Sequence, residues 1–592
     1  MKGMSLAASV IIASLFVQFA YARTEEERCK DGKTLRLVNG RIHTMDSHDR
    51  VVSSVLIRKG RFVAVGHDGN HGNDDCTDVL NLQGRTVVPG VVDNHNHIVL
   101  LGLRPGHDTR IENARSIAEV QATFAAHAKE VPAGQWLTAL GGFNINQFTP
   151  PPATARMPTL GELDDATKAH PILVMQGFNG PTATNSLGMA FFTSLGITVN
   201  PATGAIPTGA MSVRALNALR ALQTFDEQKR ALGFAMTYAA EVGVTTHLDQ
   251  GGFTYSGSPI DSKNEIDALA HFDQYRAHDA LRALYREGAL TNRIWINFLH
   301  MEQKLDTPEL RARLLNSWND FGDDMVRVLG IGEFTAGDPF VPGSQFWLNG
   351  TRLVALARWR NENHSLGFPV GGIPDWKIII DGWASVHKSI AEDQTLGLPD
   401  GISNLRWVLA HVPVIDDEYL KILKGLGGGI SLVGGWRYIS GTPTGNGPPF
   451  RRILESGIRA GLSSDGMQIS PMNPWLGMYY AVSGCNARGV LINGGQQVTR
   501  KEALQLYTAR NDWFLNLDGK IGTIEEGNYA DLIALSADYF DNKKVTTEAI
   551  KDIYSVLTVV NGKVVHDDLD GRKRMYWKLE RPAAAAKQDC VG

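Results

Sequence analysis

The chain has 592 residues, of which 43% are hydrophobic and 20% are charged, and its formal net charge at pH 7 is −4. This length is too great for one simple hydrophobic core, so we expect one large domain with an appendage, or two domains. Lysine and arginine are mixed with acidic residues throughout, whereas a nucleic-acid-binding surface needs them clustered. The composition therefore excludes a nucleic-acid partner and is typical of a globular protein.

The first 22 residues have the pattern of a secretory signal peptide. Lys2 supplies a positive charge, residues 6–19 are almost wholly apolar, and Ala20-Tyr21-Ala22 is a small-x-small cleavage pattern. The apolar stretch is short for a membrane span, and charged residues follow it at once. We predict cleavage after Ala22 and a secreted or periplasmic protein that leaves the membrane once the signal is removed. A retained membrane anchor is the alternative.

An exported protein can keep disulfides. The four cysteines allow three pairings, and the sequence does not choose among them. They lack the CxxC or Cys/His spacing of a zinc site. Two glycosylation sequons, at Asn349 and Asn363, become relevant if the host is eukaryotic. The cysteines are Cys29, Cys76, Cys485 and Cys590.

Both ends of the chain have the pattern of short strands joined by tight turns. Residues 35–45 contain Asn39-Gly40 between two apolar runs, which is a strong hairpin signal. Residues 531–565 repeat the pattern near the C-terminus. Because the two strand-rich ends have complementary patterns, we predict one β-sandwich assembled from residues 23–90 and 516–592.

The middle of the chain, residues 91–515, alternates short apolar runs with amphipathic stretches. Apolar runs bounded by glycine and followed by helices indicate buried parallel strands in βα units. We expect helices at residues 116–129, 226–242 and 417–426, and strands at residues 242–246, 327–331, 377–380, 406–409 and 459–462.

Roughly 420 residues of this alternation fit an α/β fold of the TIM (β/α)8 barrel type with insertions. In such barrels the catalytic groups lie at the carboxyl ends of the strands. A doubly wound open sheet is the alternative, but no glycine-rich phosphate-binding turn favours it. We therefore predict a TIM barrel as the catalytic domain.

The strongest local signal is an apolar strand that ends on two histidines, His95 and His97, after Pro89-Gly90. Residues two apart in an extended chain point to the same side. Two imidazoles placed in this way can bind one metal ion. The alternative interpretation is two histidines in an ordinary polar loop.

Together with this strand, a series of further motifs resembles the amidohydrolase superfamily, in particular its exported family 3 branch, which includes N-substituted formamide deformylases. The motifs occur in the order of that family and span nearly the whole mature chain. The resemblance implies a distorted TIM barrel joined to a β-sandwich, and a metal-dependent hydrolase. The motifs are Val87-Val88-Pro89-Gly90, Gly134-Gln135-Trp136, Gly243-Val244-Thr245-Thr246, Ser463-Ser464-Asp465, Glu502-Ala503-Leu504, Gly522-Thr523 and Ala530-Asp531-Leu532.

The resemblance also assigns site residues. His95 and His97 match the ligands of the first strand, and His411 matches the histidine of the sixth strand. Asp465 matches the aspartate of the eighth strand, which binds the metal and takes the proton from a bound water. Glu333 stands where the family carries a carboxylated lysine that bridges two metals. A salt bridge at the barrel rim is the alternative role for Glu333.

The fifth strand departs from the family pattern. The nearest alignment puts Ile378 where the family has a histidine, and Asp381 is the closest group that could substitute for it. We therefore expect one tightly held divalent metal, zinc by preference, with His411 and Asp381 forming a weaker second site. The ligands expected for the tightly held metal are His95, His97, Glu333 and Asp465.

By analogy with the family, the expected reaction is hydrolysis of a C–N bond in a small amide, formamide or cyclic amide, with Asp465 as general base. A metal-dependent isomerase, decarboxylase or cyclase and a non-catalytic exported binding protein are the alternatives. The oligomeric state stays open and includes a homo-oligomer. Four candidate substrate contacts are Phe143, Asn185, Trp383 and Trp436, and a core position is the alternative for the tryptophans.

Overall fold

The structure is a computed structural model. The predicted signal peptide and its cleavage site lie outside the residues that it describes. Among the described residues, no helix is both long enough and apolar enough to cross a membrane. The model describes Cys29, residues 33–66, 76–148, 155–251, 276–337, 342–441, 447–466, 468–573 and 575–579, and Cys590.

A parallel sheet of eight successive strands forms a nearly closed barrel, which confirms the predicted fold class. The two ends of this sheet meet where the backbone N–H of Asp465 donates to the carbonyl of His95 at 2.8 Å. In sheet order the strands are β8 (Val91–Asn96), β14 (Val244–Asp249), β15 (Arg293–Phe298), β17 (Val326–Ile331), β18 (Arg360–His364), β21 (Val408–His411), β22 (Gly429–Val433) and β23 (Arg459–Ser463).

The three helices predicted from the sequence are confirmed. Helix α7 (Phe225–Val242) begins with a capping box between Thr224 and Glu227 and ends at Gly243, whose φ of 92° a side chain would strain. The others are α3 (Ile117–His127) and α13 (Asp417–Gly425). Further helices are α2 (Ile98–Gly102), α9 (Asp279–Arg286), α10 (Pro308–Asn316), α11 (Gln345–Leu356), α14 (Gly435–Ser440), α15 (Phe450–Glu455), α16 (Pro474–Ser483) and α17 (Arg500–Tyr507).

The predicted strand at residues 377–380 is wrong. These residues lie in helix α12 (Asp375–Ala391), which buries Trp376, Ile379, Ile380 and Trp383 on one face. The run of three isoleucines has the pattern of a buried strand, but the apolar positions continue at helical spacing beyond it. The fifth barrel strand is instead β18, whose sequence Arg-Asn-Glu-Asn-His is polar yet wholly buried.

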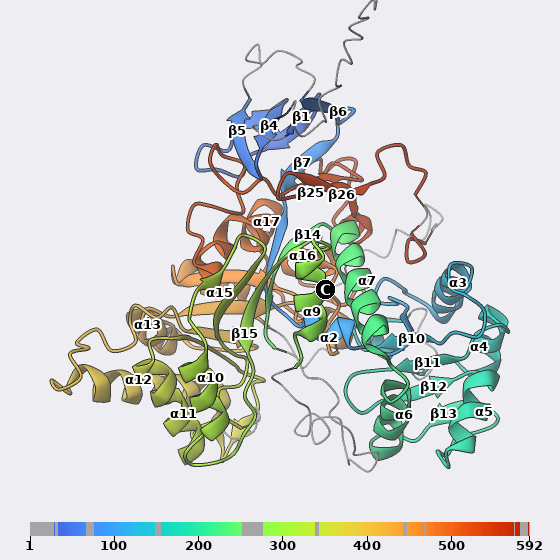
Figure 1. Ribbon diagram of the computed structural model, residues 1–592, viewed down its shortest axis with the longest axis horizontal. Helices are drawn as coiled ribbons and strands as arrows, with labels where there is room; N and C mark the ends of the chain where they lie inside the picture. The colour runs from blue at the N-terminus through green and yellow to red at the C-terminus, as the bar shows by residue number, and fades with distance from the viewer. Residues whose placement is uncertain are drawn as a thin grey trace, which may run out of the picture.

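A five-stranded sheet with its own helices is inserted between α2 and α7, on the right of the molecule in Figure 1. The sequence analysis assigned this region to the barrel domain and did not distinguish it. Its apolar side chains form two separate core clusters. The sheet order is β13 (Ala205–Ile206), β12 (Thr182–Thr184), β11 (Ile172–Met175), β10 (Leu137–Leu140) and β9 (His107–Asp108), with helices α3, α4 (Leu160–Ala166), α5 (Ser186–Ser194) and α6 (Ala210–Arg220).

Two further sheets lie above the barrel in Figure 1, and the second of them contains strands from both ends of the chain. Strand β7 pairs with β24, with Val88 opposite Ile533. The first sheet contains β5 (Arg61–Val65), β4 (Val55–Arg58), β1 (Thr34–Val38) and β6 (Thr77–Asn81). The second contains β26 (Lys563–Asp567), β25 (Ser555–Val560), β24 (Leu532–Leu535), β7 (Thr86–Pro89), β2 (Arg41–His43) and β3 (Val51–Val52).

Disulfides tie the ends of the chain to the rest of the molecule. Of the three pairings that the sequence allowed, the structure contains Cys29–Cys76 and Cys485–Cys590. The first joins Cys29 to the residue before β6, and the second joins Cys590 to Cys485 in the segment after α16.

A buried ion pair joins the barrel to the second sheet. Arg293, the first residue of β15, donates to Asp531 from Nε at 2.6 Å and from Nη2 at 3.0 Å. Asp531 also accepts from the backbone N–H of Asn561 at 2.8 Å. Because Arg293 begins its strand, the second sheet is anchored at the amino ends of the barrel strands. The carboxyl ends, where a TIM barrel holds its site, lie at the opposite side.

Candidate metal centre

Six side chains that can ligate a metal meet at the carboxyl ends of five barrel strands. Each lies within the last residues of a strand or within two residues after it, and all six are buried. The barrel topology therefore brings together groups that are as much as 370 residues apart in the sequence. They are His95 and His97 (β8), Glu333 (β17), His364 (β18), His411 (β21) and Asp465 (β23).

The first cluster contains His95, His97, Glu333 and Asp465, whose ligand atoms lie within 4.8 Å of one another. The Nε2 atom of His97 is 3.5 Å from Glu333 Oε1 and 3.4 Å from Asp465 Oδ1. The Nε2 atom of His95 is 3.3 Å from Glu333 Oε2 and 3.6 Å from Asp465 Oδ1. Ligands about 2.0 Å from a tetrahedral zinc ion lie about 3.3 Å apart, so this spacing suits one ion.

The second cluster contains Glu333, His364 and His411. His364 Nδ1 is 2.9 Å from Glu333 Oε2, and the rings of His364 and His411 stack with centroids 4.9 Å apart. His411 Nε2 also lies 3.5 Å from Asp465 Oδ2. Glu333 belongs to both clusters, so its carboxylate could contribute a ligand to a metal ion at either one.

Several ring nitrogens in the two clusters have no hydrogen-bond partner, and this indicates whether the residues fit a metal ion. Nε2 of His95, Nε2 of His364 and both ring nitrogens of His411 are buried and lack a hydrogen-bond partner. A buried polar atom without a partner is costly, and a metal ion would satisfy it. Imidazole and carboxylate donors are those that zinc and related divalent ions prefer. The residues present therefore fit one or two divalent metal ions.

The electrostatics of the centre are set by two buried carboxylates among the histidines. Burial lowers the pKa of His97, but Glu333 and Asp465 raise it to about 9. Burial would raise the pKa values of Glu333 and Asp465, but the neighbouring histidines hold both well below their usual range. Burial lowers the pKa of His411 to about 3, so this ring is neutral at pH 7. In the metal-free centre, protons on histidine balance the carboxylates.

The structure brings together His95, His97, Glu333, His411 and Asp465, the residues that the sequence analysis selected. It does not place Asp381 among them. Asp381 is exposed on α12 and accepts a hydrogen bond from the hydroxyl of Tyr419 at 3.0 Å.

His364 is the site residue that sequence reasoning missed. It ends the polar strand β18, which a search for apolar runs passes over. The available signal was Glu362-Asn363-His364, an i, i+2 pair of possible ligands like His95 and His97. The fifth-strand histidine is therefore present, and the expectation that it is lost is wrong.

Three of the four candidate substrate contacts lie in packed cores instead. Asn185 caps α5, where its Oδ1 accepts from the backbone N–H of Ile172 and of Gly188. Phe143 is buried in a core cluster of the insertion, and Trp383 on α12 packs against Trp407 with ring centroids 5.4 Å apart. Packing buries the large side chains of Phe143 and Trp383, and position in the sequence does not reveal this. Trp436, half-buried on α14, follows a barrel strand and stays a candidate.

A small cavity adjoins the second cluster. Glu333 and His364 form one side of it, and Phe334, Trp347 and Ile379 contribute apolar surface. Its volume of about 10 Å³ is that of about one water molecule, so it has no room for a larger group.

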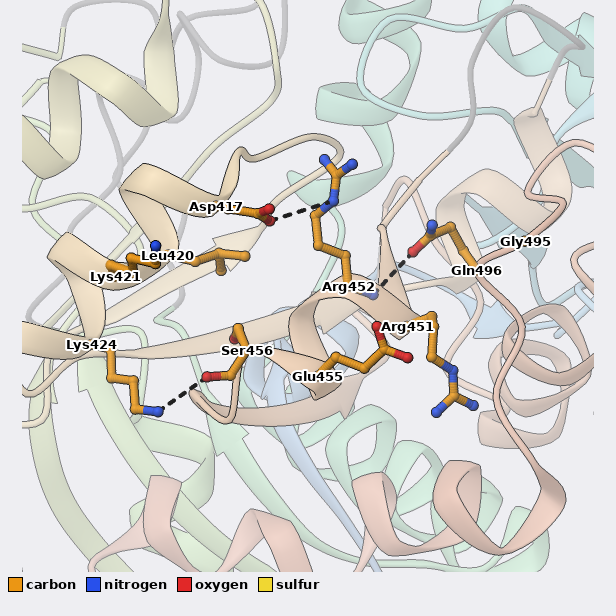
Figure 2. A pocket seen from close by; sticks show the side chains of 10 residues that line it. All are labelled: Asp417, Leu420, Lys421, Lys424, Arg451, Arg452, Glu455, Ser456, Gly495 and Gln496. Atoms are coloured by element: carbon orange, nitrogen blue, oxygen red, sulfur yellow. Dashed lines mark hydrogen bonds and ion pairs between the residues drawn. The ribbon is translucent and has the colours of Figure 1, made fainter.

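A larger groove of about 660 Å³ lies between α13 and α15, and Figure 2 shows its lining. Its cations are largely engaged: Arg451 pairs with Glu502 at 2.9 Å, and Lys424 donates to the carbonyl of Ser456 at 3.0 Å. It contains none of the six metal-ligating side chains. This groove is therefore not the candidate functional site, although it is larger than the cavity beside the second cluster.

Residues 78–566 match the model of the amidohydrolase family. The chain belongs to this family. It is 22% identical to N-substituted formamide deformylase of Arthrobacter pascens over 564 residues, which cover 90% of this chain and 98% of that protein. It is also 28% identical to the protein LONG AFTER FAR-RED 3 of Arabidopsis thaliana over 233 residues, covering 37% of this chain and 38% of that one.

Solved structures share the fold of this amidohydrolase. An uncharacterized metal-dependent hydrolase from Pyrococcus furiosus superposes with a TM-score of 0.54 at 18% identity, covering 86% of this chain and all of that one. A zinc-bound atrazine chlorohydrolase variant from Arthrobacter aurescens gives a TM-score of 0.52 at 16% identity, covering 90% and 96%. These likenesses show the fold alone. The family match and the buried clusters support a metal-dependent hydrolase.

The metal-free amidohydrolase should lose stability as the pH rises towards about 9. The pKa of His97 is about 9 in the folded protein and about 6.5 in the unfolded chain, so its contribution is complete below about pH 6.5 and is lost as the pH passes about 9. Zinc must displace this proton, so zinc affinity should increase over the same range. Thermal unfolding and chelator-buffered zinc titrations across this range measure both. A zinc affinity that does not change with pH would contradict this assignment.

Replacement of His364 by alanine should remove about one equivalent of metal per chain, because the second cluster loses a ligand while the first keeps its four. Asp381→Ala is the matched control and should keep the wild-type content. Elemental mass spectrometry of protein purified without chelator gives both numbers. Loss of metal from the Asp381 variant, or none from the His364 variant, would refute the assignment of the fifth-strand ligand.

Proposed function

We propose that this amidohydrolase cleaves the C–N bond of a small amide, formamide or cyclic amide, with zinc as the preferred metal. The observation that carries the proposal is the pair of buried clusters that share Glu333 at the mouth of the barrel. The nearly full-length match to a relative named N-substituted formamide deformylase supports this substrate class.

Asp465 is the general base in this proposal. A divalent metal held by the two clusters would polarise the substrate carbonyl and acidify a water molecule. Asp465 is 96% buried, stays ionised because histidines lower its pKa, and faces both clusters. It accepts the proton of the attacking water and then donates it to the leaving nitrogen.

The seam between β8 and β23 positions this carboxylate. The backbone of Asp465 bonds to His95, and the backbone N–H of the preceding Ser464 donates to Asp93 Oδ1 at 2.9 Å. Asp465 has a φ of 50°, a left-handed conformation that aspartate tolerates better than most residues. The proton acceptor and two of the metal ligands are therefore fixed to one another through the backbone.

The structure weakens both alternative functions. A non-hydrolytic metal enzyme was favoured by the missing fifth-strand histidine, and His364 supplies that residue. A binding protein has no need for a buried aspartate that contacts the ligands of both clusters.

We also propose that the protein is exported and acts on a small molecule outside the cytoplasm. The two disulfides support export, because such bonds persist in oxidising compartments. Glycosylation is restricted, since Asn363 is buried in β18 and donates to the carbonyl of Glu333. Of the two sequons, only the one at Asn349 stays a candidate.

Replacement of Asp465 by asparagine should lower kcat for amide hydrolysis by about 10²–10⁴-fold, because the isostere cannot accept the proton. Asp381→Asn, which changes an exposed aspartate on α12, is the matched control and should leave kcat unchanged. Amine release from a panel of N-substituted formamides, acyl amides and cyclic amides gives the rates. Full activity of the Asp465 variant would disprove its role, and an inactive wild-type enzyme on the whole panel would disprove C–N hydrolysis.

A further inference from the structure

Strand β18 carries a third buried carboxylate beside the metal centre. Glu362 precedes His364 by two residues, so both side chains project to the same side of the strand. Glu362 is 2% exposed, and its Oε1 lies 2.5 Å from Nδ1 of His95. It does not belong to either ligand cluster.

Two amide side chains hold the other oxygen of Glu362. Gln250, which follows β14, donates to Oε2 from Nε2 at 2.8 Å, and Asn297 on β15 donates to the same oxygen from Nδ2 at 3.5 Å. Asn297 also donates to Oε1 of Gln250 at 3.0 Å. The carboxylate therefore has a fixed place inside the barrel, directly beneath the first cluster.

This arrangement determines which nitrogen of His95 can ligate a metal. With Nδ1 as donor to Glu362, the lone pair lies on Nε2. That atom faces Glu333 and Asp465 and has no hydrogen-bond partner. For comparison, the Nδ1 atom of His97 faces the uncharged carbonyl of Gly251 at 3.2 Å.

We propose that Glu362 is a positioning residue that strengthens metal binding at the first cluster through His95; this inference rests on the proposed metal-dependent function. The carboxylate fixes the tautomer and the orientation of the ring and increases the electron-donating power of Nε2. Partners of this kind typically change metal affinity by 10–100-fold when they are removed. Glu362 also adds negative charge beside the first cluster, where Glu333 shares its own charge with the second.

The test is Glu362→Gln in the full-length mature protein. Glutamine keeps the shape and an oxygen that can accept from His95, but it lacks the charge. Chelator competition should show zinc binding at the first cluster weakened by about 10–100-fold and binding at the second unchanged. Repeating the titration in a His364→Ala background isolates the first cluster.

The matched control is Glu302→Gln. Glu302 is also a buried glutamate, 9% exposed, but it accepts from the backbone N–H groups of Glu309 and Leu310 at the start of α10. This variant should bind zinc as the wild type does. A second variant, Gln250→Met, removes a donor to Glu362 and should weaken the first cluster several-fold. If Glu362→Gln does not fold, the zinc affinity of Gln250→Met tests the role of Glu362 instead.

Each remaining outcome overturns the inference. Unchanged affinity at the first cluster in Glu362→Gln, with wild-type zinc content, would show that Glu362 has no such role. Equal weakening of both clusters would indicate general structural damage instead. A wild-type chain that binds no zinc would overturn the proposed function and this inference with it.

Discussion

The centre of this protein depends on the electrostatic balance of carboxylates buried among histidines. Glu333, Asp465 and Glu362 are each at most 8% exposed, and an isolated buried charge is very costly. Four histidines surround them, and His95 and His97, whose pKa values the carboxylates raise, supply compensating charge through protons in the metal-free state. A divalent metal can take over this role, so binding of metal and loss of protons are linked at the same side chains.

In this fold, the contacts that join the barrel to the second sheet and the metal-ligating residues lie at opposite ends of the barrel. The Arg293–Asp531 pair joins the amino end of β15 to the second sheet, whereas the ligands lie at the carboxyl ends of the strands. At the carboxyl ends, backbone bonds between β8 and β23 place Asp465 beside His95. Each ligand lies in a barrel strand or within two residues of the end of one, which favours a preorganised centre.

The sequence predicted the parts of this centre that follow simple periodicity. The apolar strand that leads into His95 and His97, the amphipathic helix at residues 226–242 and the strand-rich chain ends all have local signatures. The resemblance to the family added His411 and Asp465 to the predicted site residues. The hydrophobic pattern could not distinguish the inserted five-stranded sheet from the barrel, because short strands alternate with helices in both.

The error at the fifth strand has a physical cause. Barrel strand β18 has polar side chains that are buried because they pair with one another and with the centre, as Glu362 does with His95. Hydrophobic periodicity does not detect such a strand. Helix α12, with its run of isoleucines, gave the stronger strand signal. The strand that the sequence analysis missed is therefore the one that carries both His364 and Glu362. Its polar residues serve the site and do not follow the hydrophobic pattern of a buried strand.

We propose that Glu333 joins two metal positions. Anomalous diffraction at the zinc edge from crystals of the zinc-loaded protein tests it most directly. The account predicts two anomalous peaks, one among His95, His97 and Asp465 and one between His364 and His411, with a Glu333 oxygen at each. A single peak with Glu333 outside its ligand shell, or no peak among these residues, would contradict it.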